Sequence, residues 1–496
     1  MTPAQMPPRD AVHVRARDWG WRHAGRKAFA ARSLDLEISP GERVLLLGAS
    51  GAGKSTVLHG LAGVLGANDE GEQEGELLLD GAPPARARGR AGLVLQDPET
   101  QVVLARVGDE VAFAPENLAV PREEIWRRVD RALDDVGLDL PLDHSTTALS
   151  GGQKQRLALA SVLAMEPGLL LLDEPTANLD PAGVIEVRDA AVRVLERTGA
   201  TLVVVEHRVA VWADVVDRVI VLDAAGGILA DGPPGHVLTH QATRERLAAA
   251  GVWVPGWQPE LGGRMPDGGG DTLLTARDLT VARTRRGPAA VHEVGLEVRA
   301  GDALSVTGAK GAGKSTAALT LGGLLRPRSG TLEASAELAG SADSNPFRWR
   351  STQLVQRIGT VFQEPEHQFL TSTVAEELEF GPLRVGGEVD RARISEVAER
   401  LRLTQLLKAN PFTLSGGEKR RLSVATMLAT APRILILDEP TFGQDAGTWA
   451  ELVTLLRDLV HDGTAVLSVT HDADFIAALG GAELRIADGA AQLVNR

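Results

Sequence analysis

The chain has 496 residues, more than one hydrophobic core ordinarily organises, and its length predicts two or three domains. Its formal net charge is −14, and this acidic balance disfavours a dedicated nucleic-acid binder, which usually presents a basic face. Cysteine is absent, which excludes disulfides, iron–sulfur clusters and thiolate zinc sites.

No segment has the pattern of a signal peptide or a membrane span. Residues 1–8 lack the charged and then apolar layout of a secretory signal. The longest apolar runs, at 169–172 and 434–437, have the length of strands and fall far short of the roughly 18 residues of a spanning helix. We therefore expect that, if the protein works at a membrane, other chains span it.

The chain contains an internal repeat, because three motifs occur once in each half. They are GASGAGKST and GAKGAGKST at 48–56 and 308–316, LSGGQ and LSGGE at 149–153 and 414–418, and LLLLDEPT and ILILDEPT at 169–176 and 434–441. Lys54 and Lys314 are 260 residues apart, and Asp173 and Asp438 are 265 residues apart. Such a nearly constant spacing predicts the duplication of a whole domain, with small loop insertions between the motifs.

The segment between the halves is rich in Gly, Pro and Gln, which is typical of an irregular linker. We therefore expect a first domain over residues 11–240, a linker over 241–271 and a second domain over 272–496. Within the linker, Trp253 and Trp257 are expected to pack against a domain.

In chain order, each half alternates strand and helix patterns. Residues 42–48 form a β-rich run that enters a Gly-rich turn, and the stretch STVLHGLAGVL after it is helical in pattern. The apolar runs at 169–175 and 201–207 are of the kind buried on both faces of a parallel sheet. The second half repeats them with DALSVTG, ILILDEP and TAVLSVTH. The alternation predicts an α/β fold with a phosphate-binding loop in each domain.

Both Gly-rich turns satisfy the pattern GxxxxGK[ST], in which the backbone curls so that successive N–H groups point at phosphate oxygens. Two copies, each between a strand and a helix, argue against a plain surface turn. Lys54 and Lys314 are expected to reach the β- and γ-phosphates, and Ser55 and Ser315 to help hold Mg²⁺. The predicted nucleotide-binding residues of these turns are Gly48, Ala49, Ser50, Gly51, Ala52, Gly53, Lys54, Ser55 and Thr56, and Gly308, Ala309, Lys310, Gly311, Ala312, Gly313, Lys314, Ser315 and Thr316.

Acidic residues end the apolar strands that follow. Asp173 and Asp438 stand where a carboxylate can meet a metal bound at the phosphates. Glu174 and Glu439 come next and are placed to polarise an attacking water. A histidine ends a further strand in each half, where a contact with the γ-phosphate is needed. The predicted catalytic residues are Glu174, His207, Glu439 and His471.

The LSGG motif by itself is typical of a helix N-terminus, with Ser150 or Ser415 as the N-cap. It becomes specific because it stands about twenty residues before DEPT in a chain with phosphate loops. On these motifs the chain resembles the ATP-binding-cassette (ABC) ATPase family, over nearly its whole length twice. The resemblance implies two P-loop domains, each with a mainly parallel core sheet, an N-terminal antiparallel β part and a helical signature subdomain.

The resemblance also implies that the phosphate loop of one domain faces the signature of the other, so that two ATP molecules with Mg²⁺ lie between them. The first site then takes Lys54, Gln96, Asp173, Glu174 and His207 with Ser415, Gly416 and Gly417. The second takes Lys314, Gln363, Asp438, Glu439 and His471 with Ser150, Gly151 and Gly152. The implied Mg²⁺ ligands are Ser55, Gln96, Asp173, Ser315, Gln363 and Asp438. Because both glutamates and both histidines are present, we expect two competent sites.

The chain departs from the family at the adenine. The family usually stacks an aromatic residue, often Tyr, on the base, and this chain has no Tyr. Alignment of RDWGWRH with RDLTVAR places the stacking positions near His23 and Arg283, with Trp19 and Trp21 close by. Imidazole and guanidinium groups can both stack on a base.

The segments after the glutamines, at 95–121 and 362–385, resemble the ATPases of energy-coupling-factor transporters. They share Q-x-P-E-x-Q, a hydrophobic pair, a V-x-[DE]-E run and F-[AG]-P, and their repetition favours a docking groove over a solvated acidic loop. The resemblance implies integral membrane partners, namely a coupling subunit and a substrate-capture subunit. It further implies a vitamin, vitamin precursor or metal ion as cargo, and a peripheral location on the cytoplasmic face of the cell membrane.

Two other classes of function stay open. A soluble twin-cassette ATPase that acts on the ribosome or nucleic acid usually carries a long charged linker or an N-terminal cysteine cluster, and this chain has neither. An ATPase of another ABC importer class generally has a different segment after the glutamine. We expect no nucleic-acid partner. Because both halves share one chain, we expect the two domains to pair within one copy, with no homo-oligomer required.

Overall fold

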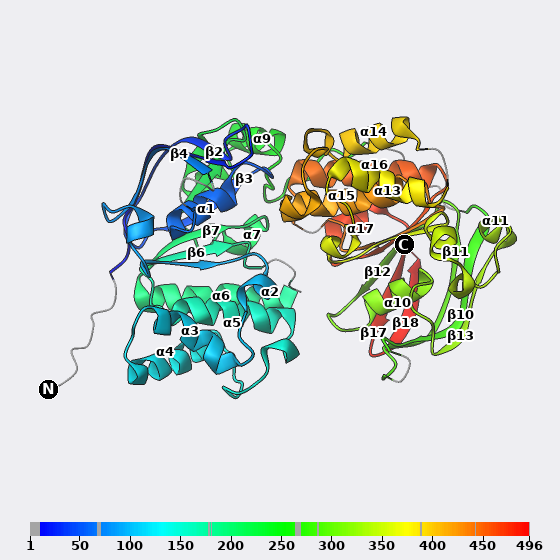
Figure 1. Ribbon diagram of the computed structural model, residues 1–496, viewed down its shortest axis with the longest axis horizontal. Coiled ribbons are helices and arrows are strands. Elements are labelled where there is room, and N and C mark those ends of the chain that lie inside the picture. Colours follow the sequence, from blue (N-terminus) through cyan, green and yellow to red (C-terminus); the bar gives the residue numbers. More distant parts are fainter. Residues whose placement is uncertain are drawn as a thin grey trace. The chain divides into compact units, whose positions relative to one another are not determined.

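The computed structural model describes residues 10–66, 71–176, 179, 181–262, 269–284, 287–386, 389–441 and 443–495, and all statements below concern these residues. The chain divides into two compact units. The first comprises Met1–Gln258 and Asp445–Gly447, and the second comprises Pro259–Gln444 and Thr448–Arg496. Each unit is an α/β domain and is described by itself (Figure 1).

The first unit contains two sheets. Its antiparallel sheet has the order β2-β1-β4, and its larger sheet has the order β5-β6-β7-β3-β8-β9, in which only the edge strand β9 is antiparallel. The strands are β1 (Val14–His23), β2 (Ala31–Ile38), β3 (Arg43–Gly48), β4 (Gly71–Leu79), β5 (Ala91–Val94), β6 (Leu169–Asp173), β7 (Thr201–Val205), β8 (Arg218–Leu222) and β9 (Ile228–Gly232).

The helices of the first unit cover both faces of the larger sheet. They are α1 (Lys54–Ala62), α2 (Pro98–Gln101), α3 (Val107–Asn117), α4 (Arg122–Asp135), α5 (Gly151–Leu163), α6 (Pro181–Thr198), α7 (Val209–Trp212), α8 (Pro234–Val237) and α9 (Gln241–Ala249), with 3₁₀ turns at Pro84–Arg86 and Thr146–Ala148. In Figure 1, α5 and α6 lie along one side of β6 and β7, and α1 lies along the other.

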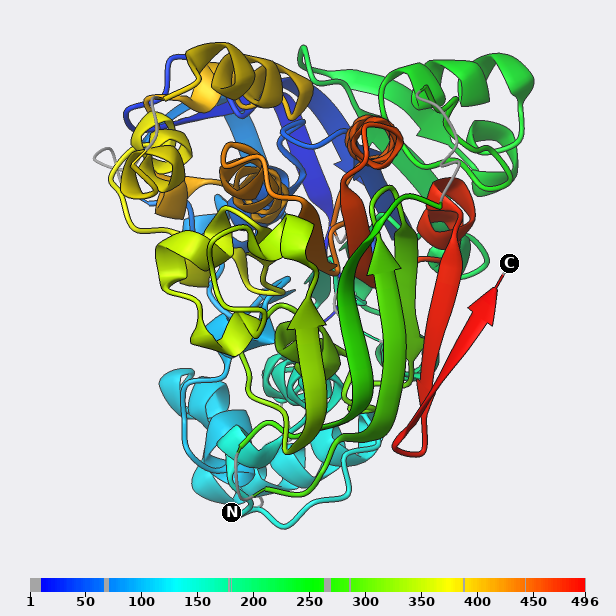
Figure 2. The ribbon, with the colours of Figure 1, turned by 90° about the vertical axis from the view of Figure 1, so that its right-hand side faces the viewer.

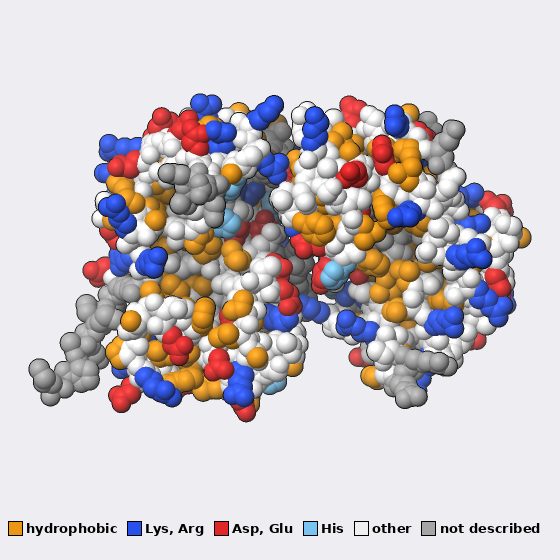
Figure 3. Space-filling model, viewed as in Figure 1, with side chains coloured by type: hydrophobic (Ala, Val, Ile, Leu, Met, Phe, Trp, Pro, Cys, Tyr) orange, Lys and Arg blue, Asp and Glu red, His pale blue; other side chains and the backbone are white. Residues whose placement is uncertain are grey.

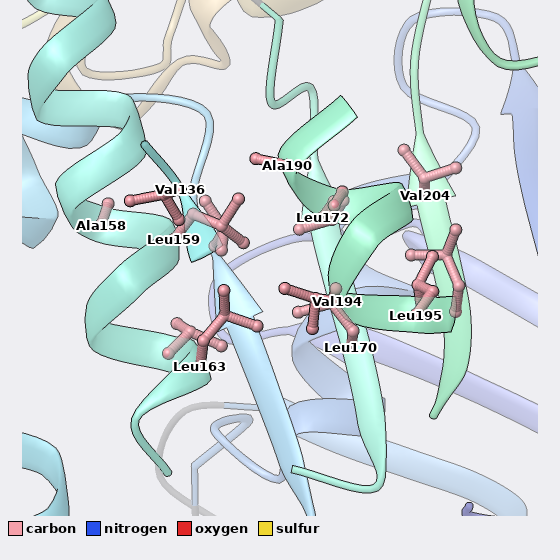
Figure 4. Close-up of a cluster of buried hydrophobic side chains, with 14 of the residues drawn as sticks. Val136, Ala158, Leu159, Leu163, Leu170, Leu172, Ala190, Val194, Leu195 and Val204 are labelled. Atoms are coloured by element: carbon pink, nitrogen blue, oxygen red, sulfur yellow. The ribbon is translucent and has the colours of Figure 1, made fainter. Parts of the chain in front are cut away.

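The strand β6 shows why the sheet is buried on both faces. Leu170 and Leu172 belong to the cluster formed with α5 and α6 (Figure 4), whereas Leu169 and Leu171 belong to the cluster formed with α1. Alternate side chains of a strand point to opposite faces, so a continuous leucine run is required when both faces carry helices. The run ends at Asp173, which the fold thereby places at the carboxyl edge of the sheet.

The second unit has one continuous sheet in the order β13-β10-β11-β18-β17-β12-β16-β15-β14. Its strands are β10 (Thr272–Val281), β11 (Val291–Arg299), β12 (Ala303–Gly308), β13 (Ser329–Ala334), β14 (Ile358–Val361), β15 (Ile434–Asp438), β16 (Ala465–Val469), β17 (Ala482–Ala487) and β18 (Ala490–Asn495). The antiparallel part joins the parallel part through β11 and β18, at His292 and Ala490. Figure 2 shows the long green strands of this part beside the red C-terminal hairpin.

The helices of the second unit repeat the pattern of the first. They are α10 (Lys314–Leu321), α11 (Ala336–Ala339), α12 (Ser351–Val355), α13 (Val374–Arg384), α14 (Arg391–Arg400), α15 (Gly416–Leu428), α16 (Ala446–His461) and α17 (Ala473–Leu479), with 3₁₀ turns at Pro346–Arg348, Pro365–Gln368, Thr404–Leu406 and Pro411–Thr413. The predicted fold class is therefore confirmed: two P-loop domains, each with a mainly parallel core sheet, an antiparallel β part and a helical signature region.

The predicted irregular linker is partly wrong, because it begins with the helix α9 and its next residues belong to the first core. Val252 and Val254 are buried, and Trp253 and Trp257 pack against the same cluster, as predicted for the two tryptophans. The sequence QATRERLAAA consists largely of strong helix formers, which is the local signal for α9 ahead of the Gly- and Pro-rich stretch. Residues 263–268 lie outside the described part.

Among the described residues, no helix combines the length and the apolarity that crossing a bilayer requires. On the face drawn in Figure 3, hydrophobic side chains are scattered among charged ones over both units.

Candidate functional site

The first Gly-rich turn connects β3 to α1 with a tightly wound backbone. Gly53, the N-cap of α1, has a φ of 85°, and a Cβ at this residue would lie 2.1 Å from the carbonyl oxygen of Ala30. Only glycine fits there. The Nζ atom of Lys54 donates to the carbonyl oxygens of Gly48 at 2.8 Å and Ala49 at 3.0 Å. The buried ammonium is thus held over the turn by neutral acceptors, which an anionic ligand could replace.

The second turn has the same construction between β12 and α10. The Nζ atom of Lys314 donates to the carbonyl oxygens of Gly308 at 2.8 Å and Ala309 at 3.0 Å. A Cβ at Gly308 would lie 2.2 Å from the carbonyl oxygen of Ile486, so this glycine is required by close backbone approach. The two predicted phosphate loops therefore share one local geometry.

Four predicted side chains meet at the carboxyl edge of the first sheet. Glu174 follows β6 with a φ of 46°, a left-handed conformation that is uncommon for a residue with a side chain. Its Oε2 atom accepts from Nε2 of Gln96 at 2.7 Å, and its Oε1 atom lies 3.0 Å from Nε2 of His207. The strand end thus brings the predicted catalytic glutamate, the loop glutamine and the histidine into direct contact beside Asp173.

The surroundings of the first half shift the pKa values of its two adjacent acidic residues, Asp173 and Glu174, in opposite directions. Burial and the neighbouring charge of Glu174 raise the pKa of Asp173 to about 6, although a hydrogen bond with Ser55 opposes the shift. Burial by itself would raise the pKa of Glu174, but the contacts with His207, Lys54 and Gln96 outweigh it and lower this pKa. The low pKa keeps Glu174 ionised, as a residue that polarises water must be.

The donor set of the first half fits a magnesium ion. Asp173 is buried, and its Oδ1 atom has no hydrogen-bond partner within the described residues. Its side chain also bonds the Ser55 hydroxyl. An unpaired carboxylate oxygen beside a serine hydroxyl and close to a phosphate loop is the all-oxygen environment that Mg²⁺ prefers.

The second half repeats the arrangement with looser contacts. Glu439 also has a left-handed φ, of 51°, but its Oε1 atom lies 3.7 Å from Nε2 of His471. Burial and the neighbouring Asp438 raise the pKa of Glu439 to about 7. Asp438 bonds the Ser315 hydroxyl, as Asp173 bonds that of Ser55. The same residue types therefore stand in different electrostatic surroundings in the two halves.

The signature motifs begin the helices α5 and α15, and the predicted N-caps are confirmed. The amide N–H of Gln153 donates to Oγ of Ser150 at 3.3 Å, and the Gln153 side chain accepts from the amide N–H of Ser150 at 2.9 Å. Ser415 and Glu418 form the same reciprocal pair at 3.4 and 2.8 Å. These capping boxes fix the start of each helix and occupy the N–H groups of Gln153 and Glu418, so the first two N–H groups of each helix have no partner within the helix.

The V-x-[DE]-E run contains a buried glutamate, which the sequence interpretation did not single out. Glu110 accepts the backbone N–H groups of Val103 at 3.0 Å and Leu104 at 2.6 Å. Glu377 does the same for Leu370 at 2.9 Å and Thr371 at 2.8 Å. The identical position of a glutamate in both halves, seven residues after an apolar one, was the available signal.

These buried glutamates hold two loops that expose an apolar side chain. Val103 is 65% exposed, and Leu370 is 68% exposed. The second glutamine of each Q-x-P-E-x-Q motif closes the base of the same loop, because Gln101 accepts from the backbone of Leu95 and Gln368 accepts from that of Phe362. The motif thus builds a stiff, apolar projection in each half.

The residues predicted around adenine divide into two groups. The rings of Trp19 and Trp21 are buried in the core and have no free face. The indole N–H of Trp21 donates to Nδ1 of His23 at 3.3 Å, so Nε2 of His23 carries the proton and faces Oγ1 of Thr56 at 3.2 Å. Burial and Arg26 lower the pKa of His23, which favours the neutral ring. Arg283 is exposed.

The comparisons with known proteins agree with this geometry. The family described as ABC transporter matches residues 31–177 and 291–442. The chain belongs to this ATP-binding family. Its members are ATPases, and the chain accordingly has two ATP-binding domains. The prediction drawn from the phosphate loops and the signatures is confirmed at this level.

Individual relatives extend over nearly the whole chain. A candidate HMP/thiamine import ATP-binding protein of Bacillus subtilis, YkoD, is 35% identical over 92% of this chain and 86% of its own length. A candidate ABC transporter ATP-binding protein of Caldanaerobacter subterraneus is 32% identical over 89% of this chain and 84% of its own length. A solved archaeal ribosome recycling factor, aABCE1, is similar in fold, with a TM-score of 0.60 and 19% identity over 96% of this chain and 90% of its own.

Proposed function

We propose that this ABC ATPase energises a membrane importer of the energy-coupling-factor type by hydrolysing two MgATP molecules. The observation that carries the proposal is the pair of stiff apolar loops that follow Gln96 and Gln363, each held by a buried glutamate. They link the nucleotide-sensing glutamines to a surface that a partner could cover. The proposed location is the cytoplasmic face of the cell membrane, peripheral to the spanning subunits.

The proposed chemistry uses the residues of each half in the same roles. Lys54 and Lys314 neutralise the β- and γ-phosphates, and the preceding turns donate backbone N–H groups to them. Bound Mg²⁺ would neutralise phosphate charge and orient the γ-phosphate, held by Ser55, Gln96 and Asp173 or by their counterparts Ser315, Gln363 and Asp438. In each half, side chains of the protein would then position the water molecule that attacks the phosphorus atom of the γ-phosphate.

Glu174 and Glu439 are the proposed residues that polarise this water. Each stands one residue beyond a proposed Mg²⁺ ligand and has a left-handed backbone conformation. His207 and His471 lie beside the two carboxylates and would contact the γ-phosphate. We propose two competent sites because every group is present in both halves, with Glu439 acting in the ionised form that prevails above its pKa of about 7.

We further propose that each ATP is closed by the signature of the opposite half. Ser415, Gly416 and Gly417 would complete the first site, and Ser150, Gly151 and Gly152 the second. The first N–H groups of α15 and α5 are suited to a γ-phosphate, because a helix N-terminus binds anions. Closure on ATP and opening after hydrolysis would drive the membrane partners.

The proposed partners are a coupling subunit and a substrate-capture subunit, both integral to the membrane. The exposed apolar loops support a docking role, because both halves expose an apolar side chain at the same position of the same hydrogen-bonded loop. The proposed cargo is a vitamin, a vitamin precursor or a metal ion. The name of the Bacillus subtilis relative, which refers to HMP and thiamine, supports the vitamin class.

Affinity purification of the full chain from detergent-solubilised membranes tests this function. We expect polytopic membrane subunits to copurify with the wild type and to be lost from a Leu370→Asp variant. The matched control is Leu324→Asp, which places the same charge on another exposed leucine outside the loop. Copurification of ribosomal RNA in place of membrane subunits would overturn the proposal.

A further inference from the structure

The signature helix of the second unit carries a buried arginine at its fifth residue. Arg420 lies on α15 and is 5% exposed. Its Nη1 atom donates to the carbonyl oxygen of Phe362 at 3.3 Å and to that of Asp438 at 3.2 Å. One guanidinium group therefore ties the signature helix to the ends of the neighbouring strands β14 and β15.

Both acceptors stand next to proposed ligands of the nucleotide and its metal. Phe362 directly precedes Gln363, and Asp438 is itself a proposed Mg²⁺ ligand, so the bonds fix the backbone from which both side chains project. Both bonds are at the long end of the N–H···O range, but the charged donor and the buried setting strengthen them relative to neutral bonds of the same length. Arg420 can therefore preorganise the metal side of the second site without touching the nucleotide.

The first unit has glutamine at the equivalent position, and it makes no such tie. Gln155 on α5 is 1% exposed, and within the described residues neither its Oε1 nor its Nε2 atom has a hydrogen-bond partner. In that half the loop glutamine is held differently, through the bond from Gln96 to Glu174. The two halves thus organise their metal ligands by different means.

We propose that Arg420 is a positioning residue that preorganises Gln363 and Asp438 for Mg²⁺, so that the second MgATP site needs less Mg²⁺ than the first. The inference rests on the proposed function, since it concerns the metal of the proposed nucleotide sites. Removing the guanidinium takes away the tie between the signature helix and both strand ends, which the sheet pairing and the Gln368 bond to Phe362 then hold alone. More of the ordering of the two ligands must then take place when the ion binds. The first half, where Gln155 holds nothing, should not respond to the equivalent change.

The experiment measures binding of N-methylanthraniloyl-ATP to the full chain as Mg²⁺ is varied. The Lys54→Ala background confines the nucleotide to the second site, and the Lys314→Ala background confines it to the first. In the first of these backgrounds, we expect Arg420→Gln to raise the half-saturating Mg²⁺ concentration about fivefold, and Arg420→Lys to recover part of the loss. In the second background, Gln155→Met should change it by less than twofold.

The outcomes separate this inference from the proposed function. If neither lysine variant removes one equivalent of bound nucleotide, the proposed pair of sites is wrong and the inference is overturned with it. If each does, but Arg420→Gln lowers the melting temperature without moving the Mg²⁺ dependence, the role of Arg420 is structural and only the inference is overturned. If Arg420→Gln does not fold, Arg420→Lys decides the question. If Arg420→Lys lowers the melting temperature but leaves the half-saturating Mg²⁺ concentration unchanged, the positioning role is contradicted.

Discussion

At the scale of single residues, Glu174 and Glu439 occupy equivalent positions, but the folded protein shifts their pKa values in opposite directions. His207 and Gln96 contact the carboxylate of Glu174, and their contribution lowers its pKa despite burial. Glu439 lacks a contact of that length to His471, so burial dominates and raises its pKa to about 7. In the second half, burial and the charge of Asp438 outweigh the positive groups around Glu439, and the protonated form is favoured.

Because the two pKa values shift in opposite directions, replacing each glutamate by glutamine is expected to change the stability of the protein in opposite directions. Because the folded pKa of Glu439 exceeds its unfolded value, its contribution to stability is present below about pH 4.5 and is lost as pH rises through 7. We expect Glu439→Gln to stabilise the nucleotide-free protein at pH 8, by on the order of 3 kcal/mol at most, and to change little at pH 5. Thermal unfolding in EDTA at the two pH values measures it.

Glu174→Gln is the matched control for that experiment. The pKa of Glu174 is lowered in the folded state, so its carboxylate stabilises the fold above the unfolded pKa and the stabilisation is lost as pH falls. We expect this variant to melt lower than the wild type at pH 8. A shift of both variants in the same direction would contradict the electrostatic difference between the two halves.

At the scale of elements, the helix α13 fixes, through Glu377, the preceding loop in which Leu370 is exposed. Glu377 accepts the N–H groups of Leu370 and Thr371 and also the hydroxyl of Thr371 at 2.8 Å, all with one carboxylate oxygen. Removing this acceptor leaves two backbone donors without their partner, at a cost of about 1–3 kcal/mol each when they stay buried. The loop would therefore lose its fixed shape before the helix unfolds.

We expect Glu377→Ala to weaken the copurification of membrane subunits at least several-fold while nucleotide binding by the purified chain changes by less than twofold. Glu379→Ala, two residues further along the same helix, is the control and should leave both unchanged. Equal losses of partner and nucleotide binding in Glu377→Ala would show that the loop is not a separate docking element.

At the scale of the whole molecule, the two units share one chain and one duplicated set of motifs. The connecting residues raise the effective concentration of one domain near the other, so pairing within one copy costs less than pairing between two copies. The units also differ: the antiparallel part forms a separate sheet in the first and is continuous with the parallel sheet in the second. Their duplication is therefore close but not exact in architecture.

Pairing within one copy predicts the mass of the ATP-bound state. We expect the Glu174→Gln, Glu439→Gln double variant to scatter light as a single 52.4 kDa chain in the presence of MgATP, with two nucleotides bound per chain. The same protein without nucleotide is the control for mass. A doubled mass on addition of MgATP would show that closure takes place between copies.

The phosphate loops, the capped signature helices and the strand-ending aspartates could be predicted from the sequence because they are local. A glycine-rich turn before a helix and a serine that caps its own helix depend on residues close in the chain, and an uninterrupted leucine run is visible in the sequence before its neighbours are known. The family and its ATPase activity follow from the same motifs, whose spacing repeats across the two halves.

Only the tertiary structure decided how the two halves differ, because burial and charge depend on residues distant in the chain. Arg420 meets Phe362 across 58 residues, and its counterpart Gln155 is left without a partner among the described residues. The opposite pKa shifts of Glu174 and Glu439 likewise depend on burial, on the charge of Asp438 in the second half and on the close approach of His207 in the first. Motif identity predicts which groups are present, whereas packing determines how strongly each is held.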